Sequence, residues 1–312
     1  MKSIVVDILG GDDNSKEILK GLKEYAINSL YHLVVVGPKE LILDYFNESD
    51  VEVIDIEKEV TNETSPMAIL HDAEDTALVA SYNYLKNHEE AIGLLTVSST
   101  GCVLTGSIFK LGLIKGIKSP VLASELYYPD FKKFLLVDCG ANIDATPAML
   151  LDFAKIGNAF MKSNGIINPR IGLANLGIEE KKGNKQMKEA YNLLKNSNLN
   201  FIGNIEFNRI YDGLADVLVS DGAIGNSIIK NSEGVAKTIL KNALISTEAY
   251  EYINHLFNYN DYGAAILLGP KRIILKAHGA ATSKTIVESL KLMEELGSND
   301  LILALEKEFS IW

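Results

Sequence analysis

The 312-residue sequence has few cysteines and no long apolar run. Its two cysteines, Cys102 and Cys139, and the lack of Cys-x-x-Cys or His-Glu-x-x-His patterns lead us to expect neither a disulfide scaffold nor a metal site. No apolar stretch approaches the ~20 residues that a membrane-spanning helix needs. The first strand runs straight into a Gly-Gly turn followed by acidic residues, which is unlike a signal peptide, so we expect a cytoplasmic protein.

Positive charge is also scarce. The chain carries 30 basic and 41 acidic residues, a formal net charge of −11, so it lacks the basic footprint of a nucleic-acid-binding protein. It also lacks a Gly-x-Gly-x-x-Gly turn with a suitably placed acidic partner, and we expect no dinucleotide or other cofactor. Phosphate remains a possible ligand, because helix ends and a few lysines can outweigh the mean charge.

Repeated strand-turn-helix units are what the sequence does contain. Short buried-strand patterns include residues 3–8, 33–36, 91–97, 134–137, 170–174, 201–206, 216–220 and 272–275. No Pro-rich or Ser-rich linker interrupts them, which favours one doubly wound α/β domain over residues 1–312, or two lobes that share a sheet. Ser65-Pro66 predicts a helix that continues to about Lys86, with His71, Asp72, Glu74 and Asp75 on a solvated face.

The stretch from Asp216 to Gly234 shows the pattern most clearly. A short apolar run breaks at Asp221-Gly222, and a helical spacing resumes at Gly225. In a parallel sheet such a turn lies at the carboxyl edge, where the amide groups of a new helix favour an anion. The stretch is therefore either a phosphate or carboxylate seat or an ordinary strand-to-helix connection.

Three other turns carry polar groups that have both a functional and a structural interpretation. Ser98 to Cys102 offers hydroxyl and amide groups for a phosphate or oxyanion. Asp138, Asn142 and Asp144 cluster at a strand end, where they either cap turns or belong to a site. Lys181 and Lys182 precede Gly183 and a helix, so they either reach a bound anion or are simply solvated.

Six short motifs occur along nearly the whole chain in an order that resembles the bacterial phosphate acyltransferases. They are Asp7-x-x-Gly10-Gly11-Asp12, Asp138-x-Gly140-Ala141-Asn142, Asn175-x-Gly177 with Lys182-Gly183-Asn184, Gly203-Asn204-x-Glu206, Asp221-Gly222-x-x-Gly225-Asn226 and Lys276-Ala277-His278-Gly279. The resemblance implies a homodimer with a three-layer α/β/α fold and a mostly parallel sheet. That fold is similar to the isocitrate and isopropylmalate dehydrogenases and to the phosphotransacetylases.

The resemblance also implies the reaction and its residues. The expected enzyme moves an acyl group from an acyl-carrier-protein or CoA thioester to inorganic phosphate, giving acyl phosphate for fatty acid and phospholipid synthesis. Lys182 would neutralise phosphate, Asn226 would hold an oxygen, and His278 would assist proton movement. The expected substrate-binding residues are Asp7, Gly10, Gly11, Thr100, Gly101, Asp138, Gly140, Asn142, Asp221, Gly222 and Gly225.

Cys102 supports an alternative enzyme. Where the family has a Gly-Asn pair, this chain has Ser98-Ser99, and a thiol follows at the start of a helix. A thiol there can have a lowered pKa and accept an acyl group, as is thought for the acyl phosphate-forming components of clostridial amino-acid reductase complexes. The other interpretations are that Cys102 packs as a small buried residue, and that the chain is a non-catalytic phosphate-binding scaffold.

The segment between Gly234 and Tyr262 differs from the family pattern in length. It is predicted to be too short for the helical hairpin that family members use at the membrane and near the carrier protein. This length argues against docking of an acyl-carrier protein and against lipid contact through such a hairpin.

Overall fold

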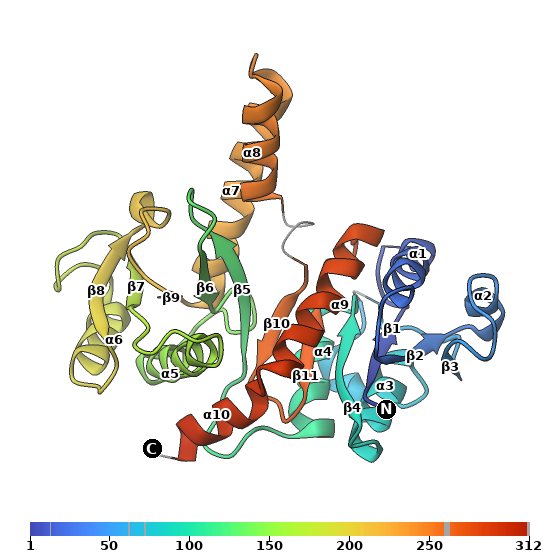
Figure 1. Cartoon of the computed structure of the whole chain (residues 1–312). Coiled ribbons are helices and arrows are strands. Elements are labelled where there is room, and N and C mark those ends of the chain that lie inside the picture. The colour runs from blue at the N-terminus through green and yellow to red at the C-terminus, as the bar shows by residue number, and fades with distance from the viewer. Residues whose placement is uncertain (13, 62, 72, 259–262, 311–312) are drawn as a thin grey trace. The chain divides into compact units, whose positions relative to one another are not determined.

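The structure is a computed structural model that describes residues 1–12, 14–61, 63–71, 73–258 and 263–310 (Figure 1). The chain divides into two compact units. Unit 1 comprises Met1–Ile114 and Asn260–Ile302, and unit 2 comprises Lys115–Tyr259 and Leu303–Trp312.

Unit 1 is built on a mostly parallel sheet. Its strands are β1 (Ser3–Asp7), β2 (His32–Gly37), β3 (Glu52–Asp55), β4 (Ala91–Thr96), β10 (Ala265–Leu268) and β11 (Ile273–Lys276). Their order is β3-β2-β1-β4-β11-β10, and only β10 pairs antiparallel. Every residue of β1 is buried, as expected for an apolar, β-branched strand that is covered on both faces of a parallel sheet.

The helices of unit 1 cover both faces of this sheet. They are α1 (Ser15–Ala26), α2 (Lys39–Leu43), the 3-10 helix η1 (Pro66–Leu70), α3 (Ala77–Asn87), α4 (Thr100–Gly106), the π-helical turn η2 (Ser107–Leu111) and α9 (Ser283–Ser298). The connections from β1 to β2 and from β3 to β4 run in opposite directions, so right-handed crossovers place α1 and α3 on opposite faces. The order in which successive strands are added to the sheet therefore reverses between β1 and β4, although these two strands are parallel. In such sheets ligands bind at the carboxyl ends of the two strands at this switch point.

Unit 2 repeats the same design. Its strands are β5 (Val121–Tyr127), β6 (Lys133–Val137), β7 (Ile171–Asn175), β8 (Phe201–Glu206) and β9 (Val217–Val219), in the order β5-β6-β9-β7-β8. Its helices are α5 (Pro147–Ser163), α6 (Lys185–Lys195), the 3-10 turn η3 (Phe207–Arg209), α7 (Gly222–Asn242) and α8 (Thr247–Phe257). The final helix, α10 (Leu301–Ser310), begins at the end of unit 1 and continues into unit 2. Because β6, β9, β7 and β8 are parallel, their carboxyl ends lie at one edge.

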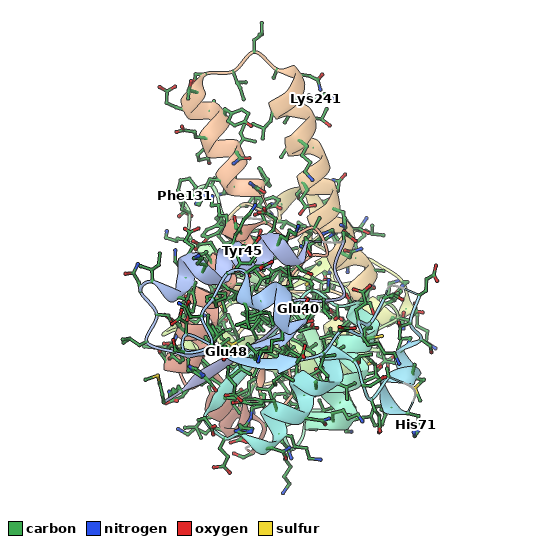
Figure 2. All side chains as sticks on the ribbon, turned by 90° about the vertical axis from the view of Figure 1, so that its right-hand side faces the viewer. Glu40, Tyr45, Glu48, His71, Phe131 and Lys241 are labelled. Carbon is green, nitrogen blue, oxygen red and sulfur yellow. The ribbon has the colours of Figure 1, made fainter. Side chains whose placement is uncertain are left out.

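The prediction of one long helix from Pro66 to Lys86 is wrong. The 3-10 helix η1 ends at Leu70 and α3 begins only at Ala77, while Asp72 lies outside the described residues. The Thr76 hydroxyl donates a 2.6 Å hydrogen bond to the Ala73 carbonyl oxygen, and the Ala77 amide donates to the Lys58 carbonyl oxygen at 2.9 Å. These bonds replace those that would continue a helix. His71 is exposed, as Figure 2 shows, and so are Glu74 and Asp75, as predicted for a solvated segment.

The prediction that the segment after Gly234 is too short for a helical hairpin is also wrong. Helices α7 and α8 pack against each other and project together from unit 2, with Lys241 near the outer end of α7 (Figures 1 and 2). The hairpin fits because α7 starts before Gly234 and the turn uses only residues 243–246. Among the described residues, no helix is both long enough and apolar enough to cross a lipid bilayer.

Aromatic side chains anchor the base of this hairpin to the turn between β5 and β6. The Phe131 ring lies 5.5 Å from the Tyr252 ring and 5.3 Å from the His255 ring, measured between centroids. The Tyr252 hydroxyl donates to the Pro129 carbonyl oxygen at 2.9 Å. Tyr211 donates to the Ser232 hydroxyl of α7 at 2.8 Å. Aromatic contacts of this kind add stability beyond the area they bury, so the hairpin is firmly attached at its base.

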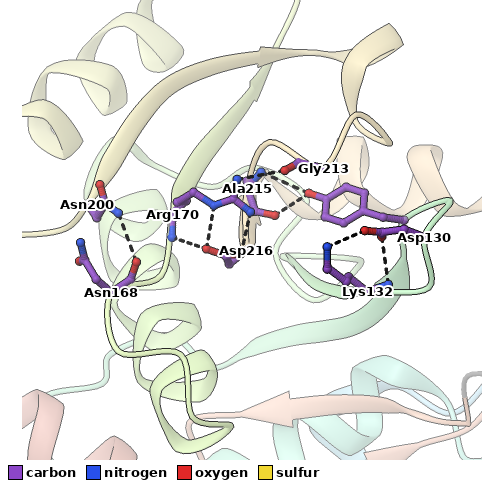
Figure 3. Close-up of polar contacts among 9 residues, drawn as sticks. Asp130, Lys132, Asn168, Arg170, Asn200, Gly213, Ala215 and Asp216 are labelled. Atoms are coloured by element: carbon purple, nitrogen blue, oxygen red, sulfur yellow. Dashed lines mark hydrogen bonds and ion pairs between the residues drawn. The ribbon is translucent and has the colours of Figure 1, made fainter.

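At the amino ends of β7 and β9, Arg170 and Asp216 form a bidentate ion pair (Figure 3). The Arg170 guanidinium donates to the two Asp216 carboxylate oxygens at 2.9 and 3.1 Å, and the Arg170 amide adds a third bond at 2.7 Å. Burial raises the pKa of Asp216, but the hydrogen bonds and charge of Arg170 outweigh it and lower this pKa below its usual value. The pair therefore joins the starts of two neighbouring strands.

We predict that Asp216→Asn lowers the free energy of unfolding at pH 7 by about 1–3 kcal/mol, because three hydrogen bonds lose their charged acceptor. The folded pKa of Asp216 is lowered, so this stabilisation is present above pH ~4 and disappears as the pH falls through the folded pKa. Urea unfolding at several pH values measures it. Asp212→Asn, which breaks the more exposed pair with Arg209, is the control and should cost about 0–1 kcal/mol. Equal losses for both variants would contradict the prediction.

Candidate functional site

Asp7 joins the carboxyl ends of β1 and β4 in unit 1. Its carboxylate accepts hydrogen bonds from the Thr96 hydroxyl at 2.8 Å, the Ser98 hydroxyl at 3.0 Å and the Leu9 amide at 3.0 Å. Asp7 and Thr96 are register partners in the parallel pair, so one side chain fixes the turns after both strands. This is the switch point described above, where the order of strand addition to the sheet reverses.

Burial raises the pKa of Asp7 from 3.8 to about 6, while its hydrogen bonds oppose the shift and the nearby charge of Glu59 adds to it. The Glu59 carboxylate accepts from the Gly10 amide at 3.1 Å. The carboxylates of Asp7 and Glu59 therefore hold the backbone at the start of the Gly10-Gly11 loop, through the amides of Leu9 and Gly10.

Glycine is required at the Gly10-Gly11 turn because the loop passes between other parts of the backbone. Gly10 has φ +83°, and a Cβ there would lie 2.5 Å from the Ser98 hydroxyl oxygen. A Cβ on Gly11 would lie 2.9 Å from the Gly279 carbonyl oxygen. Both distances are shorter than real Cβ contacts, so the loop after β1 touches the turns after β4 and β11.

His278 follows β11 and is exposed beside this loop. Its Nδ1 accepts a hydrogen bond from the Ala280 amide at 3.2 Å, which places the hydrogen of the neutral ring on Nε2. The adjacent Gly279 carbonyl oxygen accepts from the Asp12 amide at 2.9 Å. The structure thus brings together four predicted residues of unit 1: Asp7, Gly10, Gly11 and His278.

Thr100, Gly101 and Cys102 form the first turn of α4, so the thiol lies at the start of a helix, as predicted. A Cβ on Gly101 would lie 2.8 Å from the Pro66 ring, so this turn packs on η1. Cys102 is 0% exposed, and its thiol faces the Thr64 carbonyl oxygen at 3.5 Å. This geometry is that of a small buried core residue.

Asp138 organises the turn after β6 in unit 2. Its fully buried carboxylate accepts from the amides of Leu122, Gly140, Ala141 and Asn142 at 3.2, 3.0, 3.0 and 2.6 Å, and from Asn142 Nδ2 at 2.8 Å. Such a set of donors uses most of the lone pairs of an ionised carboxylate. Asp138 therefore fixes the positions of Gly140 and Asn142, as expected for a turn-capping residue.

The first turn of α7 packs directly on the Asp138 turn. A Cβ on Gly225 would lie 1.8 Å from the Asp138 carbonyl oxygen, and a Cβ on Gly222 would lie 2.9 Å from the Asn142 carbonyl oxygen. No side chain fits at either position. The glycines predicted at this turn thus serve a close approach between two backbones.

Several amides at the start of α7 already have acceptors within the protein. The Gly222 amide donates to the Asn142 carbonyl oxygen at 2.8 Å, and the Ile224 amide donates to the Asp221 carboxylate at 2.7 Å. The Asp221 side chain is the N-cap, so the helix starts at Gly222, before the predicted Gly225. The Asp221 carboxylate therefore occupies the place at the helix start that a bound anion would take. Asn226, which is exposed, follows on the same turn.

Lys182 lies in the loop between β7 and α6 and is exposed. Its Nζ lies 3.8 Å from the Glu179 carboxylate, and both side chains are more than half exposed. Two buried asparagines, Asn175 at the end of β7 and Asn204 in β8, hydrogen-bond to carbonyl groups of this loop. The loop thus presents a cation at the same edge of the sheet as the Asp138 turn and the start of α7.

The predicted residues consequently form two groups, each at the carboxyl edge of one unit. Unit 1 carries Asp7, Gly10, Gly11, Thr100, Gly101, Cys102 and His278, and unit 2 carries Asp138, Gly140, Asn142, Lys182, Asp221, Gly222, Gly225 and Asn226. Sequence reasoning missed the support given by Thr96, Ser98, Glu59 and the Asn175-Asn204 pair. Asn175 and Asn204 each fall in one of the six motifs, but the hydrogen bond between them exists only because β7 and β8 are neighbouring strands. In the described part of the chain, no three His, Cys, Asp or Glu side chains are grouped to hold a metal ion.

Comparison with known proteins identifies relatives over nearly the full length. The sequence profile of the family described as "Fatty acid synthesis protein" matches residues 2–304. The phosphate acyltransferase of Thermoanaerobacterium thermosaccharolyticum is 37% identical over 325 residues, covering 99% of this chain and 97% of the relative. These matches confirm the family resemblance seen in the six motifs.

Solved structures confirm the α/β fold class. A phosphotransacetylase from Streptococcus pyogenes is similar with a TM-score of 0.64 and 15% identity, covering 95% of this chain and 94% of that chain. An isocitrate dehydrogenase from Methylococcus capsulatus is similar with a TM-score of 0.50 and 10% identity, covering 97% and 88%. At such low identities the likeness concerns the fold alone.

We predict that Gly225→Ala lowers the free energy of unfolding by at least about 2 kcal/mol, because the new methyl group meets the Asp138 carbonyl oxygen. Gly234→Ala, in the same helix, has no atom within 4 Å of the new methyl group and should stabilise by up to about 1 kcal/mol. Chemical denaturation of both variants gives the comparison. A Gly225→Ala protein as stable as the parent would show that the helix start is not packed this tightly.

We also predict a pH dependence from Asp7. Its folded pKa of about 6 exceeds the ordinary 3.8, so its contribution to stability is greatest below pH ~4 and is lost as the pH rises to about 6. This loss corresponds to roughly 3 kcal/mol. Asp7→Asn should remove this slope when unfolding free energies of the two proteins are compared from pH 4 to 7. Parallel curves over that range would contradict the raised pKa.

Proposed function

Because the chain belongs to the phosphate acyltransferase family, we propose that it transfers an acyl group from a thioester to inorganic phosphate. The relatives that are named for this activity match it almost from end to end. Within the structure, the observation that supports the proposal best is the exposed Lys182 ammonium at the carboxyl edge of unit 2. An exposed cation there can bind phosphate before the reaction.

The proposed reaction is a direct transfer. A phosphate oxygen attacks the thioester carbonyl carbon, the carbonyl oxygen becomes an oxyanion, and the carbon-sulfur bond then breaks to give acyl phosphate and a thiolate. Lys182 neutralises the phosphate so that it can approach the carbonyl. The Asn226 amide donates to an oxygen of the reacting group. The proton that the departing thiolate takes up comes from the attacking hydrogen phosphate, and His278, with its hydrogen on Nε2, assists by donating a hydrogen bond to the sulfur.

The geometry of Cys102 favours direct transfer over an acyl-cysteine intermediate. A thiol must be accessible to attack a thioester, whereas Cys102 is fully buried and faces the Thr64 carbonyl oxygen. A direct route needs no movement of α4. We therefore assign Cys102 a packing role.

The carrier and the setting are further parts of the proposal. We propose acyl-carrier-protein or CoA thioesters as donors, a role in fatty acid and phospholipid synthesis, a cytoplasmic location and a homodimer. These rest on the family resemblance. The hairpin of α7 and α8 removes the length argument against contact with a membrane or a carrier protein.

The test is phosphate-dependent release of free thiol from acyl-carrier-protein and acyl-CoA thioesters. We predict that Lys182→Ala raises the KM for phosphate by about 10- to 100-fold, the equivalent of one charge-assisted hydrogen bond, with a smaller effect on the KM for the thioester. Lys181→Ala is the matched control and should change the KM for phosphate less than about twofold.

The same assay separates the competing functions. Cys102→Ala should retain activity, because the thiol only packs; complete loss with the fold intact would instead favour the acyl-cysteine route. If neither type of thioester is cleaved in the presence of phosphate, the chain is a binding scaffold and the proposed function is wrong.

A further inference from the structure

Two neighbouring asparagines lie beneath the loop that carries Lys182. Asn175 is the last residue of β7, and Asn204 lies in β8, which pairs parallel with β7. Asn175 is 2% exposed and Asn204 is 8% exposed. Buried asparagine side chains are costly unless their amide groups are hydrogen-bonded, so their partners indicate what they do.

The side chains of these asparagines bond to each other and to the loop. Asn175 Nδ2 donates to Asn204 Oδ1 at 3.1 Å and to the Lys182 carbonyl oxygen at 3.3 Å. Asn204 Nδ2 donates to the Glu179 carbonyl oxygen at 2.9 Å. Asn175 Oδ1 accepts from the Leu176 amide at 2.8 Å. Together they hold the loop at its start and at residues 179 and 182.

The loop itself is shaped to keep the Lys182 backbone against this pair. The Lys182 amide donates to the Glu179 carbonyl oxygen at 3.0 Å, the same oxygen that Asn204 holds. Gly183 has φ +86°, and a Cβ there would lie 2.7 Å from Asn175 Oδ1. Only glycine lets the chain pass so close to the asparagine.

The stem of Lys182 is also confined. A Cβ on Gly177 would lie 3.1 and 3.3 Å from Cγ and Cδ of Lys182, so these methylene groups lie over the bare glycine backbone. The backbone position and the first part of the side chain are therefore both fixed, while the ammonium group stays exposed. A flexible lysine gains positional accuracy only when its attachment point is held in this way.

We propose that Asn204 and Asn175 are positioning residues that hold Lys182 for phosphate, an inference that rests on the role proposed above for Lys182. The strand pairing of β7 and β8 uses backbone groups and does not need these side chains. Among the residues that the structure describes, their side-chain hydrogen bonds reach only each other and the backbone from residue 176 to residue 182. Their effect on the reaction should therefore pass through the lysine.

A double-mutant cycle tests this link. We expect Asn204→Ala to raise the KM for phosphate by about 10-fold when Lys182 is present, with a smaller change in kcat, because phosphate binding is what the lysine supports. In the Lys182→Ala background the same substitution should change kcat/KM for phosphate by less than about twofold. A residue with a purely structural role would lower activity equally in both backgrounds.

Two further variants guard against a folding defect. Asn204→Asp keeps the size of the side chain and the acceptor for Asn175 but loses the donor to Glu179, so it should act in the same direction as Asn204→Ala. Asn200→Ala is the matched control, because Asn200 precedes β8 and its side chain donates to the Asn168 carbonyl oxygen at 3.2 Å, away from the Lys182 loop (Figure 3). It should leave the KM for phosphate unchanged. Thermal unfolding of every variant confirms that the compared proteins are folded.

The outcomes distinguish this inference from the function on which it rests. Equal effects of Asn204→Ala or Asn204→Asp with and without Lys182 overturn the positioning role and leave the phosphate role of Lys182 standing. A normal KM for phosphate in Lys182→Ala itself overturns both. An effect of the Asn204 variants that is confined to proteins with Lys182 supports the inference.

Discussion

The buried Asp138 carboxylate accepts five hydrogen bonds at the point where β6 ends and the next loop begins. Three of them come from backbone amides of that loop, and a fourth comes from Leu122 of β5, so the loop has little freedom once Asp138 is in place. The start of α7 then packs on this loop at a distance that only glycine permits at residues 222 and 225. Asp7 has the corresponding position in unit 1, where it accepts from the turns after β1 and β4. Each unit thus uses one buried carboxylate to set the backbone at the edge where ligands bind.

This arrangement separates residues that shape the edge from residues that are available for chemistry. Asp7, Asp138, Asp221 and the glycines have their polar groups or their space taken up by neighbouring backbone or, for Asp7, also by the hydroxyls of Thr96 and Ser98. Lys182, Asn226 and His278 are exposed instead. These are the three residues to which the proposed transfer of an acyl group to phosphate assigns chemistry.

Helix α7 links two different surfaces of unit 2. Its first turn, capped by Asp221, is part of the candidate site, and its last turns form one side of the hairpin with α8. Because an α-helix rises about 1.5 Å per residue, 21 residues span roughly 30 Å. The aromatic contacts of Phe131 with Tyr252 and His255 brace the base of the hairpin between these two ends.

The sequence by itself determined the fold class, most of the strands and the order of the turns, because apolar runs followed by glycine and a helical spacing are local signals. It also pointed to Lys182 and Asp138 through short motifs. It failed for the segment from Pro66 to Lys86, where hydrogen bonds from Thr76 and to Lys58 outweighed helix propensity. It failed as well for the hairpin, whose length depends on where α7 begins. Only the tertiary structure decided that Asp7 meets Ser98, that Asn204 supports the Lys182 loop and that Cys102 is buried. Those contacts join residues 91, 25 and 38 positions apart, and no local pattern records which strands become neighbours.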